Sequence, residues 1–284
     1  MPTLIDGKLV AQTLRKKFAD EVEALKKQGI TPGLAVILVG NDSASAVYVR
    51  NKKKACAETG IASLCYELPE DTSKEELLAL IEELNGREDV DGILVQLPLP
   101  GGIDKSEIIN AISPEKDVDA FNVSNVGKIA VGEKGFVPCT PAGVMELFKF
   151  YNVDLTGKNC VIVGRSNIVG KPMALLCTAA DATVTLCHSK TVGLSEITKR
   201  ADVLISTVGK AKFITADMVK DGAVVIDVGI NRDENRKLCG DVDFENVSKK
   251  ASLISPVPGG VGPMTITMLL QNTITSAKKR GNIQ

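Results

Sequence analysis

Tyr48 and Lys52 stand four positions apart in the stretch YVRNKKKACAETG, which has the pattern of a helix ending at Gly60. Residues at positions i and i+4 share one helix face, so both side chains can line a single cleft. A lysine amine acts as a general base only where it is neutral for part of the time, and free lysine is almost fully charged at neutral pH. Charged runs on helices usually face solvent, so other parts of the chain must decide whether Lys52 has a chemical role.

A second pattern is typical of nucleotide binding. The stretch NCVIVGRSNIVGKPMALL predicts a strand, a tight turn and a helix, with Gly164 at the strand end and Gly170 at the helix start. Pro172 fits the first helical turn, where its missing N–H costs little. This layout aims free backbone N–H groups at a pyrophosphate. The spacing differs from G-x-G-x-x-G, so an ordinary glycine turn of an α/β protein stays open as an alternative.

The next strand indicates which dinucleotide would bind. It ends in VTLCHSK and offers His188, Ser189 and Lys190 but no carboxylate, whereas an NAD site needs an Asp or Glu for the ribose 2′-hydroxyl. With Arg165 directly after the first glycine, polar and cationic groups in both places favour the 2′-phosphate of NADP. His188 is the only histidine, and an ordinary surface histidine is an equally good interpretation. One histidine and no C-x-x-C pair predict no metal site.

The elements that must position these residues alternate between helix and strand. Gln96 ends one predicted strand just before Pro98, at the carboxyl end where open α/β sheets bind ligands. Strands separated by single helices imply parallel pairing and right-handed crossovers. Besides the helix of Lys52, the patterns of the first half predict a helix over 6–29 with Asp6 as its N-cap, and a helix over 73–86 that opens with a capping box of Ser73 and Glu76. They also predict strands over 33–40, 61–68 and 91–100.

Residues 113–141, which include Asp119, show no sustained period, and a helix is predicted from Pro141 to about Tyr151. We place the domain junction near Cys139. The fold class predicted is α/β with two domains, the second with a Rossmann-like parallel sheet. The second half predicts strands over 159–163, 183–187, 202–206 and 223–228, a helix near 170–180, and a last helix from Pro263 to about Lys279.

Composition excludes several function classes. The length of 284 residues suits two α/β domains, and 44% hydrophobic with 24% charged residues is typical of a soluble globular protein. A net charge of −1 gives no general attraction to nucleic acid or to an anionic membrane. Asp6 and Lys8 interrupt what a signal peptide would need as an apolar core, and no apolar run approaches the ~20 residues of a membrane span. Scattered cysteines without a disulfide pattern favour a reducing cytoplasm.

Eight stretches, taken in order, resemble the bifunctional methylenetetrahydrofolate dehydrogenase/cyclohydrolase family over nearly the whole chain. They are YVRNKKKACAETGI, DGILVQLPLP, PEKDVDAFN, FVPCTPAG, VGRSNIVGKP, CHSKT, IDVGIN and PVPGGVGPMT. The resemblance implies oxidation of 5,10-methylenetetrahydrofolate by NADP and hydrolysis of the methenyl product to 10-formyltetrahydrofolate, in one-carbon metabolism. It also implies a homodimer joined through the cofactor domains. The implied domains are a folate-binding catalytic domain, 1–138 joined by helix 263–284, and an NADP-binding domain, 139–262.

Carried over residue by residue, the resemblance implies that Lys52 is the catalytic lysine, Gln96 its partner and Asp119 the acid that holds the pterin. Tyr48 is implied to lie against the aminobenzoyl ring, and we expect the neighbouring lysines to be solvated charges. The further substrate contacts implied are Pro98, Gly259, Gly260, Val261 and Pro263. The cofactor contacts implied are Gly164, Arg165, Ser166, Ile168, His188, Ser189, Thr207, Gly209 and Ile230.

These residue types fit the two reactions. Hydride transfer chiefly requires that the donor carbon and the nicotinamide be held in contact. Hydration requires one general base, because water must lose a proton as it attacks the cation. Gln96 can hydrogen-bond the Lys52 amine without stabilising its charge, which a carboxylate at that position would do.

Three alternative functions share some of these features. Tyr-x-x-x-Lys also marks short-chain dehydrogenases, but there the nucleotide turn precedes the pair, and here the pair comes first. A shikimate-type dehydrogenase shares the two-domain plan, yet it explains neither PGGVGPMT nor the strand of Gln96. A non-catalytic NADP-binding regulator would bind the cofactor without turnover of any folate.

Overall fold

The chain forms two compact units, each built on its own parallel sheet. A computed structural model describes residues 2–283, except for the side chains of Ser43 and Ala44. One unit, which we call the Lys52 unit, comprises Gln12–Cys139 and the chain from Ile266 onward. The Gly164 unit comprises the chain up to Ala11 and Thr140–Thr265. Helices α1 (Gly7–Lys26) and α10 (Val261–Arg280) each contribute residues to both units.

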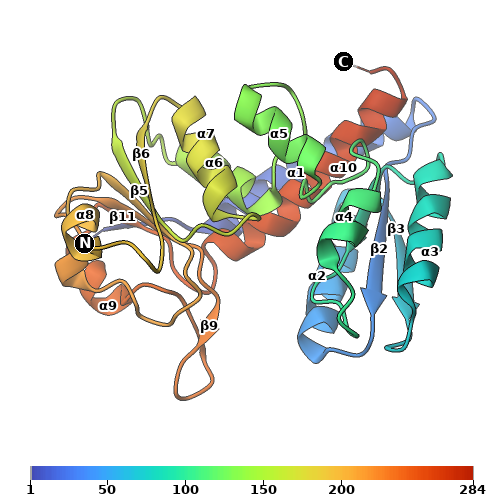
Figure 1. The fold of residues 1–284 in the computed structure, drawn as a ribbon. Coiled ribbons are helices and arrows are strands. Elements are labelled where there is room, and N and C mark those ends of the chain that lie inside the picture. Colours follow the sequence, from blue (N-terminus) through green and yellow to red (C-terminus); the bar gives the residue numbers. More distant parts are fainter. Residues whose placement is uncertain (1, 284) are drawn as a thin grey trace. The chain divides into compact units, whose positions relative to one another are not determined.

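The Lys52 unit contains a three-stranded parallel sheet with the order β3-β2-β4 (Figure 1). The central strand β2 (Gly33–Val39) is buried along its whole length, as expected for a run of apolar residues in a parallel sheet. Its neighbours are β3 (Ala62–Leu68) and β4 (Gly92–Val95). Four helices accompany the sheet in the sequence: α2 (Ser43–Thr59), α3 (Lys74–Gly86), α4 (Lys105–Ala111) and α5 (Val123–Val131).

Local capping explains where these helices begin and end. The Asp6 side chain accepts hydrogen bonds from the N–H groups of Lys8 and Leu9, so it caps α1 as predicted. Ser73 and Glu76 form the predicted capping box at the start of α3. Helix α2 ends at Gly60, whose φ of 76° lies in the left-handed region that glycine adopts without strain.

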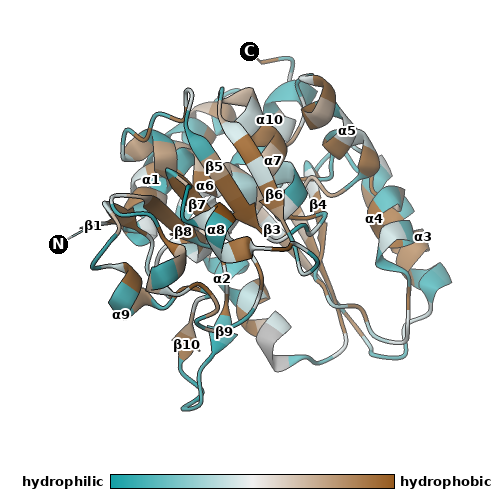
Figure 2. Ribbon diagram, turned by 60° about the vertical axis from the view of Figure 1, so that its left-hand side comes forward, coloured by the Kyte–Doolittle hydropathy of each residue, from teal (hydrophilic) through white to brown (hydrophobic). Residues whose placement is uncertain are grey.

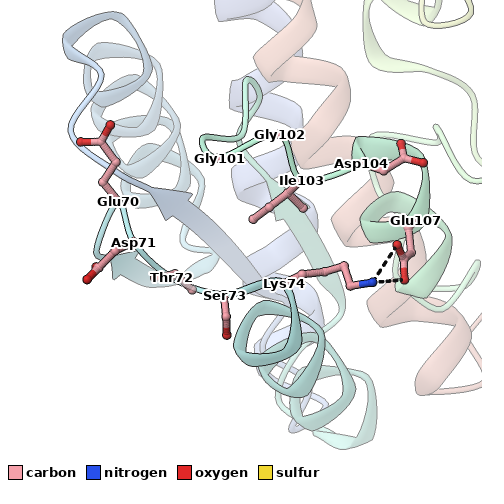
Figure 3. Close-up of a pocket in the computed structure, with 10 residues that line it drawn as sticks. All are labelled: Glu70, Asp71, Thr72, Ser73, Lys74, Gly101, Gly102, Ile103, Asp104 and Glu107. Atoms are coloured by element: carbon pink, nitrogen blue, oxygen red, sulfur yellow. Dashed lines mark hydrogen bonds and ion pairs between the residues drawn. The ribbon is translucent and has the colours of Figure 1, made fainter.

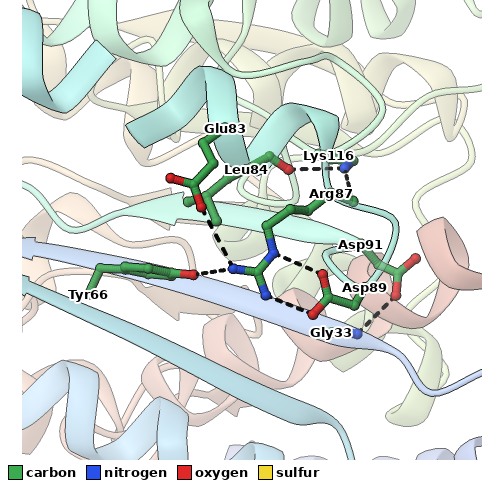
Figure 4. A network of polar contacts seen from close by, with 8 residues as sticks. All are labelled: Gly33, Tyr66, Glu83, Leu84, Arg87, Asp89, Asp91 and Lys116. Carbon is green, nitrogen blue, oxygen red and sulfur yellow. Dashed lines mark hydrogen bonds and ion pairs between the residues drawn. The ribbon is translucent and has the colours of Figure 1, made fainter. Parts of the chain in front are cut away.

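Figure 4 shows polar contacts made by the residues between α3 and β4. The Arg87 guanidinium donates to both carboxylate oxygens of Asp89, at 2.9 and 2.7 Å, and to the hydroxyl of Tyr66 at 2.8 Å. Asp91, just before β4, accepts a 2.9 Å hydrogen bond from the N–H of Gly33 at the start of β2. The carboxyl ends of β2 and β4 lie at the opposite edge of the sheet, where Gln96 directly follows β4.

The last helix packs within the Lys52 unit through its carboxyl-terminal half. Lys278 pairs with Glu21 of α1 at 2.6 Å, and the Arg280 guanidinium donates to both oxygens of the buried Asp91, at 2.8 and 3.2 Å. These contacts confirm the predicted return of the last helix to the first half of the chain.

The Gly164 unit contains a six-stranded sheet whose neighbouring strands all run parallel, in the order β1-β11-β8-β7-β5-β6. Figure 2 shows the hydrophobic colouring of its central strands, and the buried core includes Val161, Leu204 and Val225. The strands are β1 (Thr3–Leu4), β5 (Asn159–Val163), β6 (Thr183–Cys187), β7 (Val203–Ser206), β8 (Val224–Asp227) and β11 (Leu253–Ile254). The unit also contains α6 (Cys139–Phe150), α7 (Gly170–Ala179), α8 (Leu194–Thr198), the 3₁₀ helix Ala216–Met218, α9 (Phe244–Val247) and the antiparallel pair β9 (Asn231–Arg232) and β10 (Leu238–Cys239).

The two-domain α/β prediction is confirmed, and two local features differ from it. The first eleven residues group with the second half of the chain, because β1 pairs with β11. Residues 113–141 were predicted to be irregular, yet they contain α5, which the Asn122 side chain caps by accepting from the N–H of Ser124. A nine-residue helix with Gly127 inside it leaves little periodicity in the sequence.

Candidate active site

The Lys52 side chain meets Gln96 at the carboxyl end of the three-stranded sheet. Lys52 lies on α2, and its Nζ donates a 2.8 Å hydrogen bond to Oε1 of Gln96, which directly follows β4. The Gln96 backbone N–H donates to the carbonyl of Ile37 on β2, and its side-chain Nε2 donates to the carbonyl of Leu97, each at 2.8 Å. The amide is therefore fixed with its oxygen towards the amine, and both side chains are partly buried.

Burial and the carboxylate of Asp119 have opposite effects on the pKa of Lys52. Loss of hydration in the site lowers the pKa of Lys52, and the nearby Asp119 is the largest opposing influence. Burial likewise raises the pKa of Asp119, against the attraction of Lys52. Both shifts favour the uncharged forms, so Lys52 is neutral more often than a solvated lysine. This is the condition that general-base chemistry requires.

The segment of Asp119 is contacted by Asn272 on α10 and by Cys139 at the start of α6. The Asn272 side chain donates to the backbone carbonyls of Val118, at 2.8 Å, and Val137, at 3.1 Å. The Cys139 thiol donates to the carbonyl of Val118 at 3.3 Å, and it also hydrogen-bonds the Asp119 carboxylate. Burial raises the pKa of Cys139 well above its ordinary value, so this thiol stays protonated and serves as a donor.

The remaining predicted residues of this unit lie close to Lys52 or Gln96 in the sequence. Tyr48 is one helical turn before Lys52 on α2, and 42% of its surface is exposed, so a flat ligand can reach its ring. Pro98 follows a cis peptide bond two residues after Gln96. Lys53 and Lys54 are exposed, and Lys54 makes only a 3.9 Å surface ion pair with Glu58. The three consecutive lysines therefore divide into one partly buried amine and two solvated charges, as predicted.

The predicted phosphate-binding turn joins β5 to α7 in the Gly164 unit. Gly164 has a φ of 124°, and a Cβ there would collide with Thr207, so only glycine fits. A Cβ on Gly170 would collide with the carbonyl of Gly164, which is the close packing of turn and helix that the sequence predicts. The Ser166 hydroxyl accepts weak hydrogen bonds from the N–H groups of Val169 and Gly170, at 3.2 and 3.3 Å.

A cavity of about 390 Å³ opens beside this turn. Its walls include Arg165, His188, Ser189 and Lys210. Thr207 also lines it, and the buried Oγ1 of Thr207 has no hydrogen-bond partner within the described part of the chain. A buried hydroxyl without a partner is costly, so a polar ligand atom in this cavity would satisfy it. The cationic rim and the orphan hydroxyl fit a phosphorylated dinucleotide.

The other predicted cofactor residues surround the same turn and its neighbouring loops. Ile168 is exposed in the turn itself, and Gly209 has a φ of 68° in the loop after β7. Ile230 is exposed directly before β9. His188 makes two hydrogen bonds within its own loop: its ring Nδ1 accepts from the backbone N–H of Lys190 at 3.1 Å, and its backbone N–H donates to the hydroxyl of Thr191 at 2.8 Å.

The predicted substrate loop lies at the start of α10, in the Gly164 unit. The Gly259 carbonyl accepts from the N–H of Lys8, and the Gly260 carbonyl lies where a Cβ on Gly7 would be, so the loop packs tightly on the start of α1. Val261 begins α10 and Pro263 occupies its first turn. A Cβ on Gly260 would collide with the carbonyl of Pro256, and Gly259 has a φ of 105°, so both positions of the loop favour glycine.

Two residues of the Lys52 site were not predicted from the sequence. Cys139 lies in the quoted stretch FVPCTPAG, where it served only to mark the domain junction, and no local pattern pointed to Asn272. The contact of Asn272 with the Asp119 segment depends on the return of α10, which spacing along the chain does not encode.

The Lys52 unit also contains a hollow that none of the predicted site residues line. A hollow of about 530 Å³ is lined mainly by acidic and small residues, including Glu70, Asp71 and Asp104, and Lys74 there pairs with Glu107 at 3.2 Å (Figure 3). Within residues 2–283, no group of His, Cys, Asp and Glu side chains could hold a metal ion. None of the described helices is long and apolar enough to cross a membrane.

A parallel nucleotide-binding sheet in one unit and a lysine–amide–carboxylate group in the other define a two-domain, nucleotide-dependent enzyme. The family description "Tetrahydrofolate dehydrogenase/cyclohydrolase, catalytic domain" matches residues 5–119, and the NAD(P)-binding domain of the same family matches residues 138–281. The chain therefore belongs to the tetrahydrofolate dehydrogenase/cyclohydrolase family.

Relatives and solved structures agree with this assignment. The chain is 58% identical to "Bifunctional protein FolD" of Agathobacter rectalis, over 98% of this chain and 100% of the relative. A crystal structure of the bifunctional FolD enzyme from Campylobacter jejuni is 54% identical, with a TM-score of 0.97 over 99% of this chain and 100% of that one. The Trypanosoma brucei enzyme, complexed with NADP and an inhibitor, is 40% identical, with a TM-score of 0.94 over 98% of each chain.

Shikimate dehydrogenase, the alternative weighed above, shares only the fold. The Aquifex aeolicus structure is 16% identical with a TM-score of 0.52, over 88% of this chain and 97% of that one. This likeness explains the common two-domain plan and carries no argument about substrate.

Proposed function

We propose that Lys52, with Gln96 and Asp119, carries the chemistry of a bifunctional folate enzyme. The chain is an NADP-dependent methylenetetrahydrofolate dehydrogenase and methenyltetrahydrofolate cyclohydrolase. It oxidises 5,10-methylenetetrahydrofolate to the methenyl cation and hydrolyses that cation to 10-formyltetrahydrofolate. The observation that carries the proposed role of Lys52 is its 2.8 Å hydrogen bond to a neutral amide, in a site where burial lowers the pKa of the amine.

The two units have separate tasks in this proposal. The Lys52 unit binds the folate and supplies the groups that handle protons. The Gly164 unit binds NADP, with Arg165 and Ser189 at the 2′-phosphate and Thr207 donating its hydroxyl proton to an acceptor of the cofactor. Bound NADP supplies the hydride acceptor. The glycine loop at the start of α10 contributes substrate contacts through Gly259, Gly260, Val261 and Pro263.

The oxidation step places few demands on acid–base groups. The lone pair of the folate nitrogen expels the hydride from the methylene carbon and leaves an amidinium-like cation. The protein must chiefly hold that carbon in position, and Tyr48 and Asp119 are suited to this task. The exposed Tyr48 ring packs against the aminobenzoyl ring, and the Asp119 carboxylate binds the amino-pyrimidine edge of the pterin.

The hydration step requires a base. Water attacks the methenyl carbon and transfers a proton to the neutral Lys52 amine, while Gln96 keeps that amine oriented towards the substrate. The cationic substrate lowers the pKa of Lys52 further, because two neighbouring positive charges repel each other. The site thus produces its base most readily when the methenyl cation is bound.

We also propose a cytoplasmic location and a homodimer. Free cysteines, five of them buried, suit a reducing compartment, and cytoplasmic enzymes of this size often pair through a two-fold axis.

A spectrophotometric assay with methylenetetrahydrofolate and either NADP or NAD tests the proposed function. We expect NADP-dependent formation of the methenyl compound, followed by its hydrolysis. Cofactor binding without turnover of any folate would instead identify a regulator, and turnover of shikimate would identify the other dehydrogenase class.

A further inference from the structure

The buried carboxylate of Asp241 joins three segments of the Gly164 unit. One oxygen accepts hydrogen bonds from the Ser206 hydroxyl, at 3.1 Å, and from the N–H of Val208, at 2.7 Å. The other accepts from the N–H of Lys210, at 3.0 Å, and from the Asn231 side-chain amide, at 2.9 Å. Asp241 has no exposed surface, so the two oxygens exchange their hydration for these four donors.

These donors alternate along the chain with residues proposed to contact the cofactor. Thr207 lies between Ser206 and Val208, and Gly209 lies between Val208 and Lys210. Ile230 directly precedes Asn231 in the same way. The carboxylate therefore fixes the backbone beside the proposed contacts without occupying their positions.

Asp241 is itself held rigidly. Its backbone N–H donates to Asp227 at 2.9 Å, and the Asp227 carboxylate also accepts from the N–H groups of Gly229 and Val242, at 2.9 Å each. A Cβ on Gly229 would collide with the Asp241 carboxylate, which shows how closely the loop before β9 packs on it. Within the described part of the chain, no basic side chain forms an ion pair with Asp241, so its partners are neutral donors.

We propose that Asp241 is a positioning residue for NADP binding: it holds the loop 206–210 and the start of β9 in the shape that receives the dinucleotide. The inference rests on the proposed function of the Gly164 unit. All four acceptor directions of the Asp241 carboxylate face hydrogen-bond donors. An asparagine of the same shape keeps one oxygen and turns an amide NH₂ towards two of those donors, so it loses two hydrogen bonds and creates a donor–donor contact.

The test compares Asp241→Asn with Asp243→Asn, a control two residues away whose carboxylate accepts from the Asn246 side chain on α9. The Kd for NADP and for NAD is measured by calorimetry on the protein without folate, and both activities are then assayed. For Asp241→Asn we expect both Kd values and the KM for NADP to rise about ten-fold or more. Methenyl hydrolysis, which uses the Lys52 unit, should stay within about two-fold of the parent rate.

Retained methenyl hydrolysis distinguishes a positioning role from general destabilisation. A weakening of both NADP and NAD binding distinguishes it from recognition of the 2′-phosphate. Loss of both activities together with a lowered melting temperature, or an unchanged Kd for NADP, would overturn the inference. If Asp241→Asn does not fold, Ser206→Ala removes one donor of the same carboxylate. It should then weaken NADP binding several-fold, and unchanged binding in that variant would refute the role. A parent protein that binds NADP but turns over no folate would contradict the proposed function alone.

Discussion

The Lys52 amine and the Gln96 amide are joined by a 2.8 Å hydrogen bond from Nζ to Oε1. The direct partner of the amine is therefore neutral, and burial lowers the pKa of Lys52 although Asp119 opposes this shift. A base whose folded-state pKa is lowered gains its neutral form as the pH rises through that pKa. Hydrolysis of the methenyl compound should accordingly increase with pH through that range and be lost below it.

Replacing the neutral Gln96 by an anionic residue should shift the pH dependence of methenyl hydrolysis. In Gln96→Glu, the new carboxylate stabilises the ammonium form and raises the pKa of Lys52. We expect slower hydrolysis at neutral pH and a higher pH optimum, measured as methenyl hydrolysis across pH after subtraction of the uncatalysed rate. Gln96→Met is the neutral control, and its rate should fall without an upward shift of the optimum. An identical pH profile for Gln96→Glu and the parent would show that the residue at position 96 does not influence the pKa of Lys52.

Arg165 should distinguish the two dinucleotides, because only NADP carries a 2′-phosphate. Arg165 is exposed at the rim of the 390 Å³ cavity, so its substitution leaves the core intact. Arg165→Ala should weaken NADP binding by roughly 1.5–3 kcal/mol, or about ten- to a hundred-fold, and NAD binding much less. Calorimetric Kd values for both cofactors measure this difference. Equal losses would mean that Arg165 does not recognise the 2′-phosphate.

The last helix should contribute measurably to the stability of the Lys52 unit. Arg280→Met leaves the Asp91 carboxylate buried without its cation, and removing one member of such a pair costs roughly 3 kcal/mol. The matched variant Arg87→Met breaks a more exposed pair with Asp89 and should cost about 1 kcal/mol or less. Urea unfolding followed by circular dichroism compares the two midpoints. A smaller effect for Arg280→Met than for Arg87→Met would contradict this ranking.

Much of this architecture follows from local patterns. The apolar run of β2, the capping box of Ser73 and the glycine turn at Gly164 each depend on neighbours within a few residues, and each was predicted. The pairing of Lys52 with Gln96 and the roles expected of both residues came from the family resemblance. The sequence pattern itself placed Lys52 on a helix and Gln96 at the carboxyl end of a strand.

The features that the sequence did not reveal depend on distant contacts. Strand β1 has two residues, and its only strand partner in the described sheet is β11, about 250 positions away in the chain. Asn272 supports the Asp119 segment from a helix 154 residues away, and Asp241 bonds the loop after β7 across 31 to 35 residues. Such contacts have no period or motif in a single sequence.

The central claim is that the Lys52 amine acts as the base of the hydration step. Lys54→Met is the matched control, because it removes a lysine two positions away on the same helix that is exposed to solvent. Both variants should be purified and assayed for methenyl hydrolysis, with NADP reduction followed separately.

We expect Lys52→Met to abolish methenyl hydrolysis and to slow NADP reduction less, since oxidation requires a positioned substrate but no base. Lys54→Met should retain both activities. Hydrolysis by Lys52→Met at the parent rate would show that the amine is only a charge on the helix and would contradict the account.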